Sequence, residues 1–369
     1  MKLKCLVHHL KNALSLTEKI SGKSATLPVL NGVLISSKNK ELKLAVTNLE
    51  VGIEIKIPAK IEKEGETVVP AKIMYNFISN LPSDENIELE SAQNNLILTT
   101  NNSSTIIKGY PVEDFPPLPS FKKEKEESFN LAVNDFLLGL NSVYYAASLT
   151  EMKPEIASVF ITSSKSDPLT FVATDSFRLA RKNIPYYFPG FHLLLIPYRN
   201  VIEIMRVFEN ENGDIKIIPN KNQLFLFTER IKFVSRLTEG TFPDYEEIIP
   251  KTFITDVILD KNAFNNSLKT ASVFSGKLNE IKMEIIPEKK AVKIQTSNSD
   301  FGEHIVFLPA EIKGEKLKIT FNHRYIADGL RFISSDKVFL RFNGENKPLL
   351  MTDIKESSFC YLAMPMKDL

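Results

Sequence analysis

The sequence has few of the residues from which metal centres and disulfide frameworks are built. Its 369 residues include two cysteines, Cys5 and Cys360, near opposite ends of the chain, and five histidines without the spacing of a metal-ligand motif. A disulfide framework or a four-ligand zinc site therefore has nothing to be built from. We predict that both cysteines are buried in the core, as free cysteine usually is.

The sequence is also poor in glycine, with 14 residues, and lacks the motifs that glycine serves in enzymes. No Gly-rich phosphate loop precedes a predicted helix, and no Gly-x-Ser-x-Gly elbow occurs. The Thr-Asp-Ser segment at 174–176 is the best candidate for a catalytic group, but no histidine or cysteine lies near it in the sequence. We therefore expect a protein that is not an enzyme, with no cofactor and no metal.

Long apolar runs are missing too. None approaches the roughly 20 residues needed to span a bilayer, and the first residues carry charge where a signal peptide would be apolar. We expect a cytoplasmic protein without a membrane partner. The net charge of +1 neither requires nor excludes nucleic acid, because only the distribution of charge over the surface decides that.

The chain repeats itself three times, and its length suits two or three domains. Each repeat opens with an amphipathic stretch that predicts a helix, at 6–23, 133–149 and 260–277. Runs rich in Val, Ile and Phe follow, then a second predicted helix at 70–82, 197–210 or 322–334, and then more strands. We predict an α+β fold in which each repeat holds two similar halves, with two helices packed on antiparallel sheets.

Two of the repeats end alike, with GYPVEDFPPLP at 109–119 and GTFPDYEEIIP at 240–250. Both segments finish in proline, which blocks continuation of a strand. The charged run KKEKEE at 122–127 is typical of a solvated linker. These features predict three domains, at 1–121, 122–250 and 251–369.

The order and spacing of four segments across the whole chain resemble the beta subunit sliding clamps of bacterial DNA polymerase III. These segments are TLPVLNGVLI (26–35), VATDSFRLA (172–180), FPDYEEIIP (242–250) and the terminal MPMKDL (364–369). The resemblance implies a homodimer closed into a six-domain ring around double-stranded DNA, with helices lining the hole. It further implies a processivity factor whose partners are the polymerase alpha subunit, the clamp loader and other proteins with a clamp-binding motif.

The predicted helices form a weakly basic lining, which suits a protein that slides. Counterion release makes phosphate binding independent of base sequence, so a few Lys and Arg contacts allow movement along the duplex. The resemblance indicates that loops after the first helix of each domain reach the DNA, through Lys23, Lys153 and Lys277. The helices add the candidates Lys72, Arg199, Arg206, Lys269 and Arg324.

The resemblance also implies an apolar groove between domains two and three, into which partner proteins dock a short peptide. The matching positions are Ile156, Thr174, Ser176, Phe177, Arg178, Leu179, Pro243, Ile248, Leu362, Met364, Pro365 and Met366. Methionine suits such a site because its flexible, polarizable side chain repacks around different ligands. Relatives commonly have Gly-His where this chain has Ser176-Phe177, and Arg-Leu at the end where it has Lys367-Asp368-Leu369.

The ring would need two equivalent joints, each between domain one of one chain and domain three of the other. The matching positions are Thr105, Ile106 and Ile107 on a strand that would extend the sheet across the joint, with Val273 and Phe274. A different class of function stays open at this point. A repeat scaffold that binds proteins without encircling DNA would share the peptide groove and differ only in closure and lining.

Overall fold

The computed structural model describes residues 1–22, 27–119, 127–191 and 193–366, and the chain folds into two compact units. Unit 1 comprises Met1–Leu137 and Arg199–Leu237, and unit 2 comprises Leu138–Tyr198 and Thr238–Leu369. Each unit is thus assembled from segments that are far apart in the sequence. The linker expected at 122–127, except Glu127, lies outside the described residues.

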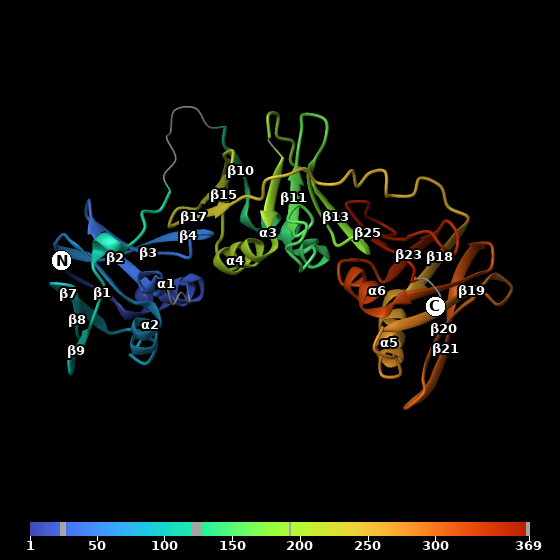
Figure 1. Ribbon diagram of the computed structural model, residues 1–369, viewed down its shortest axis with the longest axis horizontal. Coiled ribbons are helices and arrows are strands. Elements are labelled where there is room, and N and C mark those ends of the chain that lie inside the picture. Colours follow the sequence, from blue (N-terminus) through green and yellow to red (C-terminus); the bar gives the residue numbers. More distant parts are fainter. Residues whose placement is uncertain (23–26, 120–126, 192, 367–369) are drawn as a thin grey trace. The chain divides into compact units, whose positions relative to one another are not determined.

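Within the described ranges, a strand runs directly into a helix six times (Figure 1). Four further strands follow the first helix before the next leading strand, and three follow each of the other helices. The six helices are α1 (Val7–Ile20), α2 (Ala71–Ser79), α3 (Val133–Asn141), α4 (Tyr198–Phe208), α5 (Lys261–Ser272) and α6 (His323–Leu330). The strands that lead into them are β1 (Lys2–Leu6), β6 (Glu66–Pro70), β10 (Phe129–Ala132), β14 (Leu194–Pro197), β18 (Thr255–Asp260) and β22 (Leu317–Asn322). The six predicted halves are confirmed, and each has a leading strand that the sequence prediction did not include.

Unit 1 contains two antiparallel sheets. The first has the order β5-β1-β7-β8-β9, with β5 (Lys60–Lys63), β7 (Asn86–Ala92), β8 (Asn95–Thr99) and β9 (Ser104–Ile107). The second has the order β10-β15-β16-β17-β4-β3-β2-β6, with β2 (Gly32–Lys38), β3 (Glu41–Thr47), β4 (Val51–Ile57), β15 (Asp214–Pro219), β16 (Gln223–Phe227) and β17 (Ile231–Arg236). Because β4 pairs with β17, one sheet continues from the first repeat into the second.

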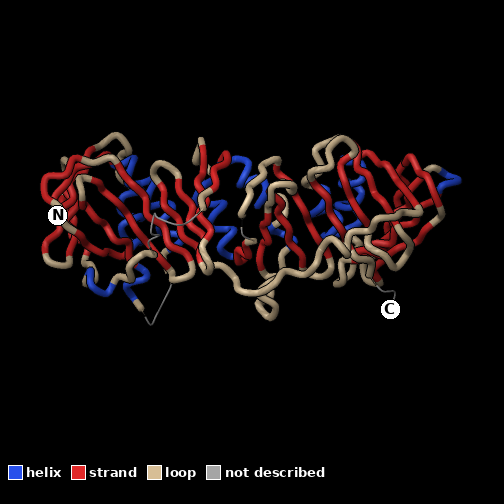
Figure 2. Tube along the Cα trace, turned by 90° about the horizontal axis from the view of Figure 1, so that it is seen from above, coloured by secondary structure: helices blue, strands red, loops and turns tan. Residues whose placement is uncertain are grey.

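Unit 2 is built on one continuous sheet of 12 strands, ordered β14-β11-β12-β13-β25-β24-β23-β18-β21-β20-β19-β22. The strands not yet given are β11 (Ser158–Thr162), β12 (Leu169–Thr174), β13 (Arg178–Ile184), β19 (Glu280–Ile286), β20 (Ala291–Asn298), β21 (Gly302–Gly314), β23 (Lys337–Phe342), β24 (Leu349–Asp353) and β25 (Phe359–Ala363). Figure 2 shows the strands of each unit running side by side. The β13–β25 pair joins the second repeat to the third, as β4–β17 joins the first to the second.

The helices form because apolar residues recur along one face, and that face is buried. In α1, Val7, Leu10 and Leu14 are fully buried against β3 and β4 and against α2. Side-chain caps satisfy free amides at two helix starts, where Asp260 accepts a hydrogen bond from the Ala263 amide and Asn322 from the Arg324 amide.

The prediction of one continuous helix over 133–149 is wrong. Helix α3 ends at Asn141, and a 3-10 turn, η3 (Tyr144–Ala146), follows it. The Ser142 hydroxyl donates to the Leu138 carbonyl, and β-branched Val143 lies at φ −129°, outside the helical region. These features coincide with the end of the helix after nine residues, although apolar residues continue beyond it.

The remaining sequence predictions about the core concern the cysteines and the apolar spans. Cys5 and Cys360 are both buried and unbonded to each other, as predicted. Burial raises the pKa of the Cys5 thiol to about 12, so this residue is inert at neutral pH. No helix in the described part of the chain is long and apolar enough to cross a membrane.

Candidate peptide-binding site

The centre of the candidate site is the turn Thr174–Arg178, between β12 and β13. The Thr174 hydroxyl donates to the Arg178 carbonyl (2.7 Å) and accepts from the Ser176 amide (3.2 Å). One carboxylate oxygen of Asp175, Oδ1, accepts from the amides of Phe177 and Arg178, both at 2.9 Å. These bonds hold Ser176 in the left-handed region at φ +75°, a conformation that favours glycine.

Residues of the third repeat form hydrogen bonds with this turn and with the strand that follows it. Strand β25 pairs with β13, placing Leu179 opposite Leu362 and Arg178 opposite Ala363. Beyond the paired residues, the Met364 amide donates to the Phe177 carbonyl at 2.8 Å. The structure therefore brings Phe177 and Leu179 together with Leu362 and Met364, although the two pairs are about 185 positions apart in the sequence.

The four residues differ in burial, because Leu179 and Leu362 are buried while Met364 is half-buried and Phe177 is exposed. Leu179 and Leu362 are each 2% exposed and belong to a core cluster with Val172 and Leu195. The Phe177 side chain is 61% exposed, which is unusual for so large an apolar group. Met364, Pro365 and Met366 are half-buried, and the Met366 amide donates to the Thr320 carbonyl at 2.8 Å.

Three other predicted groove residues lie in neighbouring segments. Pro243 and Ile248 are exposed on the segment that follows β17, where Phe242 stacks on Phe160 with ring centroids 4.9 Å apart. Ile156 is buried, and its amide donates to the Lys153 carbonyl. The terminal Lys367-Asp368-Leu369 lies outside the described residues.

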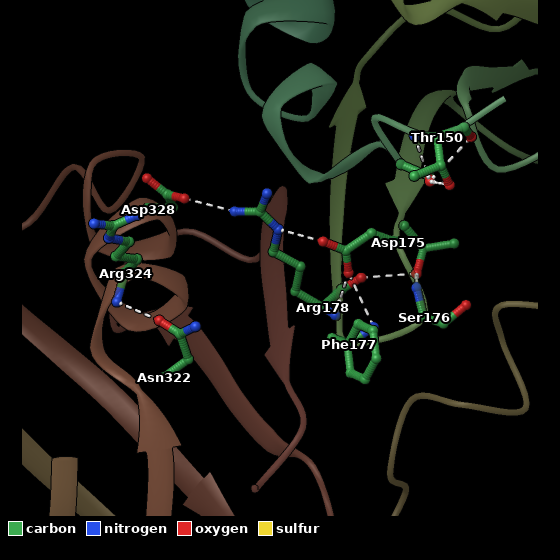
Figure 3. Close-up of polar contacts among 10 residues, drawn as sticks. Thr150, Asp175, Ser176, Phe177, Arg178, Asn322, Arg324 and Asp328 are labelled. Atoms are coloured by element: carbon green, nitrogen blue, oxygen red, sulfur yellow. Dashed lines mark hydrogen bonds and ion pairs between the residues drawn. The ribbon is translucent and has the colours of Figure 1, made fainter. Parts of the chain in front are cut away.

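Arg178 differs from the other predicted groove residues because its charge is engaged within the chain (Figure 3). Its Nε donates to Asp175 Oδ2 at 2.9 Å, and its Nη1 donates to Asp328 Oδ2 at 2.5 Å. The guanidinium also lies 4.7 Å from the centroid of the Tyr325 ring. The sequence analysis missed Tyr325 and Asp328, and it considered Asp175 only as part of a possible catalytic segment. A repeated Thr-Asx pair before a strand, at 47–48 and 174–175, was the signal available for Asp175.

Most of the candidate DNA-contacting residues are exposed. Exposed positions on helices or loops are Lys72, Lys153, Arg199, Lys269, Lys277 and Arg324. Arg206 is different, because its Nη1 lies 2.8 and 2.7 Å from the two carboxylate oxygens of Glu203, and this pairing neutralises much of its charge. Lys23 lies outside the described residues.

Among the residues that the structure describes, the candidate joint residues occupy an open sheet edge and the end of a helix. Strand β9 is the last strand of its sheet, and its Ile106 side chain is 65% exposed while Ile107 is buried and Thr105 half-buried. Val273 is exposed after α5, and half-buried Phe274 stacks on His304, 5.9 Å between ring centroids.

A second open edge was missed by the sequence analysis. Strand β21 pairs with β20 through Gly302–Pro309 and with β18 through Ala310–Gly314. Its first half therefore has a strand partner on one side only, among the residues that the structure describes, and it carries the exposed side chains of Ile305 and Phe307. The apolar run IVF at 305–307 within a strand-like segment was the available sequence signal.

Comparison with known proteins agrees with this architecture along the whole chain. Family models of the DNA polymerase III beta subunit match in order: the N-terminal domain over residues 1–119, the central domain over 130–244 and the C-terminal domain over 246–367. The beta sliding clamp of Synechococcus elongatus is 27% identical, covering 100% of this chain and 99% of its own length. That of Synechocystis sp. is 29% identical over the same shares of the two chains.

Among solved structures, the DNA polymerase III subunit beta from Pseudomonas aeruginosa superposes with a TM-score of 0.94 at 24% identity, covering 100% of both chains. The threefold repeat, the six equivalent halves and the continuous sheets define a three-domain clamp fold. The chain belongs to the DNA polymerase III beta subunit family. It is a DNA sliding clamp, a non-catalytic processivity subunit of the replicative polymerase.

Proposed function

We propose that two copies of this chain close head to tail around duplex DNA in the cytoplasm, each copy contributing three domains at 1–121, 122–250 and 251–369. The observation that carries this proposal is the pair of open strand edges, β9 in the first repeat and the first half of β21 in the third. An open edge is a template for pairing, and a chain with one at each end of its repeats can pair twice with a second copy.

The exposed apolar side chains along these edges support the same proposal. Ile106 on β9 and Ile305 and Phe307 on β21 would be costly to leave in water, and pairing of the two edges would cover them. Val273 and Phe274 follow α5 in the same repeat as β21. The joint therefore consists of Thr105, Ile106, Ile107, Val273 and Phe274, extended by Ile305 and Phe307.

Ile106→Arg tests the joint, because this exposed side chain can be changed without burying a charge inside the chain's own core. A buried, unpaired charge in the joint costs several kcal/mol, so sedimentation should give a folded monomer. Tyr187→Arg, at a similarly exposed apolar position outside the joint, should remain a dimer. An unchanged dimer mass for Ile106→Arg at low micromolar concentration would refute this joint.

Encirclement itself is tested on DNA. A ring should stay on DNA because of topology, so clamps loaded onto nicked circular DNA should survive a moderate-salt wash and leave when the circle is cut. Direct binding by unloaded chains should be weak and should fall steeply with salt, because it depends on a few Lys-phosphate contacts. Retention that is the same on cut and uncut DNA would mean that the chain binds by local contacts alone.

The DNA-contacting residues act in loading rather than in retention. These residues are Lys23, Lys72, Lys153, Arg199, Arg206, Lys269, Lys277 and Arg324. Replacing Lys23, Lys153 and Lys277 by alanine should reduce loading and direct binding, while retention on a closed circle changes little. Arg206 should contribute least, because Glu203 already pairs with it.

The turn Thr174–Arg178, together with Met364–Met366, is proposed as the docking surface for the polymerase alpha subunit, the clamp loader and other proteins with a clamp-binding motif. The support is that the exposed Phe177 is joined by a backbone hydrogen bond to the half-buried Met364, next to the buried Leu179–Leu362 pair. Exposed aromatic anchors over a packed floor are typical of binding hot spots. Because Phe177 offers an apolar ring where relatives commonly have histidine, this chain should prefer more apolar peptides.

A further inference from the structure

We infer that Asp328 of helix α6 is a positioning residue for the peptide-binding turn, and that it acts through Arg178. This inference rests on the proposed docking of peptides at the turn. It assigns Arg178 and Asp328 a role in setting the orientation of Phe177, rather than a direct contact with the peptide.

A continuous series of charge-assisted hydrogen bonds joins α6 to the turn (Figure 3). Asp328 Oδ2 accepts from Arg178 Nη1 at 2.5 Å, and Arg178 Nε donates to Asp175 Oδ2 at 2.9 Å. The second oxygen of Asp175 accepts from the amides of Phe177 and Arg178. The carboxylate that fixes the turn is therefore itself fixed by an arginine held from α6, and bonds of this type are about twice as strong as neutral ones.

The environment of Arg178 makes this link sensitive to the loss of Asp328. The arginine side chain is 11% exposed and the Asp175 side chain 15%, so neither charge is well solvated. The Tyr325 ring covers the guanidinium at 4.7 Å, and Tyr325 and Asp328 both come from α6. A largely buried cation needs its counter-charges, and a planar guanidinium offers donors in a fixed geometry to both carboxylates at once.

Helix α6 is a firm support for this link. Asn322 caps its first turn, and Gly329 lies so close to Tyr361 of β25 that a Cβ there would approach the ring at 2.5 Å. The same strand β25 leads to Met364, whose amide binds the Phe177 carbonyl. Asp328 and Met364 thus hold the turn from two elements that are packed directly on each other.

The turn Thr47–Val51 in unit 1 shows that the arginine is not needed to form this backbone shape. There the Thr47 hydroxyl donates to the Val51 carbonyl at 2.9 Å, and Asn48 Oδ1 accepts from the amides of Glu50 and Val51 at 3.0 and 2.8 Å. Valine occupies the position of Arg178, and asparagine that of Asp175. The Arg178–Asp328 pair therefore adds an attachment to α6 that the fold of the turn does not require.

Asp328→Asn removes the charge that holds Arg178 with little change in shape. We expect binding of a labelled peptide with the clamp-binding motif of the polymerase alpha subunit, followed by fluorescence anisotropy, to weaken on the order of tenfold. Asp328→Glu, which keeps the charge, should recover most of the affinity. Glu311→Gln breaks the exposed Lys337–Glu311 pair and serves as the matched control, with unchanged affinity expected.

A double-mutant cycle separates positioning from a general loss of stability. In an Arg178→Met background, Asp328→Asn should cause little further loss of peptide affinity, because its route to the turn is already gone. Full additivity, or wild-type affinity for Asp328→Asn, would overturn the inference. If Asp328→Asn fails to fold in thermal melts, Tyr325→Leu removes the stacking partner of the same guanidinium and should weaken the peptide as well, and unchanged affinity would then overturn it.

The proposed docking function can fail separately. A wild-type chain that binds no such peptide would refute that function and this inference with it. A wild-type chain that binds the peptide, and whose affinity is the same after Asp328→Asn, would refute only the role of Asp328.

Discussion

The turns Thr47–Val51 in unit 1 and Thr174–Arg178 in unit 2 have the same backbone and different side chains. In both, a threonine and an Asx residue make the same set of hydrogen bonds, and the third residue lies at φ +75°. The carbonyl of the fourth residue accepts from the end of the adjoining strand, from the Arg236 amide in unit 1 and the Met364 amide in unit 2. The repeated sequence pattern therefore produces the same backbone conformation in both turns, and the side chains determine the function of each turn.

The side chains close the first turn and leave the second open. In unit 1, Gly52 follows the turn where unit 2 has Leu179, and a Cβ at Gly52 would come within 2.6 Å of Leu118 Cδ2. The chain's own Leu118 therefore occupies the space beside this turn, and Glu50 pairs with Arg236 at 3.6 Å. In unit 2 the fourth residue is the exposed Phe177, and the turn is attached to α6 through Arg178.

The largest expected effect on peptide binding comes from removing the strand end that contacts the second turn. Deleting Met364–Leu369 removes the amide that binds the Phe177 carbonyl, together with two methionines, and should abolish peptide binding in anisotropy titrations. The dimer should persist in sedimentation, because this segment is not part of the proposed joint. Retained peptide affinity in the truncated chain would contradict the assignment of the site.

Removing the threonine hydroxyl from either turn should lower the stability of the protein, but only the change in the second turn should weaken peptide binding. Thr47 and Thr174 are both buried, and each hydroxyl both donates and accepts within its turn. Thr→Val at either position should lower the free energy of unfolding by about 1 to 3 kcal/mol in urea titrations. Thr174→Val should also weaken the peptide, whereas Thr47→Val should leave its affinity unchanged, and equal binding losses would remove the distinction between the turns.

Replacing the residue in the left-handed conformation by glycine should change the free energy of unfolding by a smaller amount and in the opposite direction. Leu49→Gly and Ser176→Gly should each relieve strain at φ +75° and raise the free energy of unfolding by up to about 1 kcal/mol. Leucine, with the larger side chain, should gain more than serine. A loss of stability at both positions in urea titrations would show that neither turn is strained.

The smallest expected effect is on the pH dependence of stability. It concerns the first residue of the second helix in a repeat, which is Ala71 in the first repeat and His323 in the third. Burial, helped by Arg324, holds the pKa of His323 below its ordinary value of 6.5. The unfolded chain therefore binds the proton more readily, so stability is full above about pH 6.5 and falls as the pH drops through the lower folded-state pKa. Urea titrations at about pH 7.5 and 5.5 should show a smaller pH dependence for His323→Ala, and an unchanged dependence would contradict this account.

Much of the fold was predictable from the sequence because helix and strand periodicity are local. Apolar spacing identified all six helices, and the repeated order of elements identified the three domains. The length of α3 was not predictable in this way, because apolar residues continue past Asn141 while Ser142 and Val143 end the helix. The pairing of β4 with β17 and of β13 with β25 joins segments about 180 residues apart, which no local pattern reveals.

The site was predictable in its composition and less so in its arrangement. The resemblance pointed to Phe177, Leu179, Leu362 and Met364, which the fold brings together. It also placed Arg178 among the groove residues, but the resemblance did not indicate that Asp175 and Asp328 engage its charge. Ion pairs of this kind depend on three-dimensional placement, here of α6 beside β13, and the sequence contains no period or motif for them.

The central claim is that only the second of the two equivalent turns binds partner peptides. Its most direct test compares Phe177→Ala with Glu50→Ala, which truncate the fourth residue of each turn, by anisotropy of the labelled polymerase peptide. The account predicts a loss on the order of 1 to 3 kcal/mol for Phe177→Ala, typical of a truncated aromatic anchor, and wild-type affinity for Glu50→Ala. Unchanged affinity for Phe177→Ala, or an equal loss for Glu50→Ala, would contradict it.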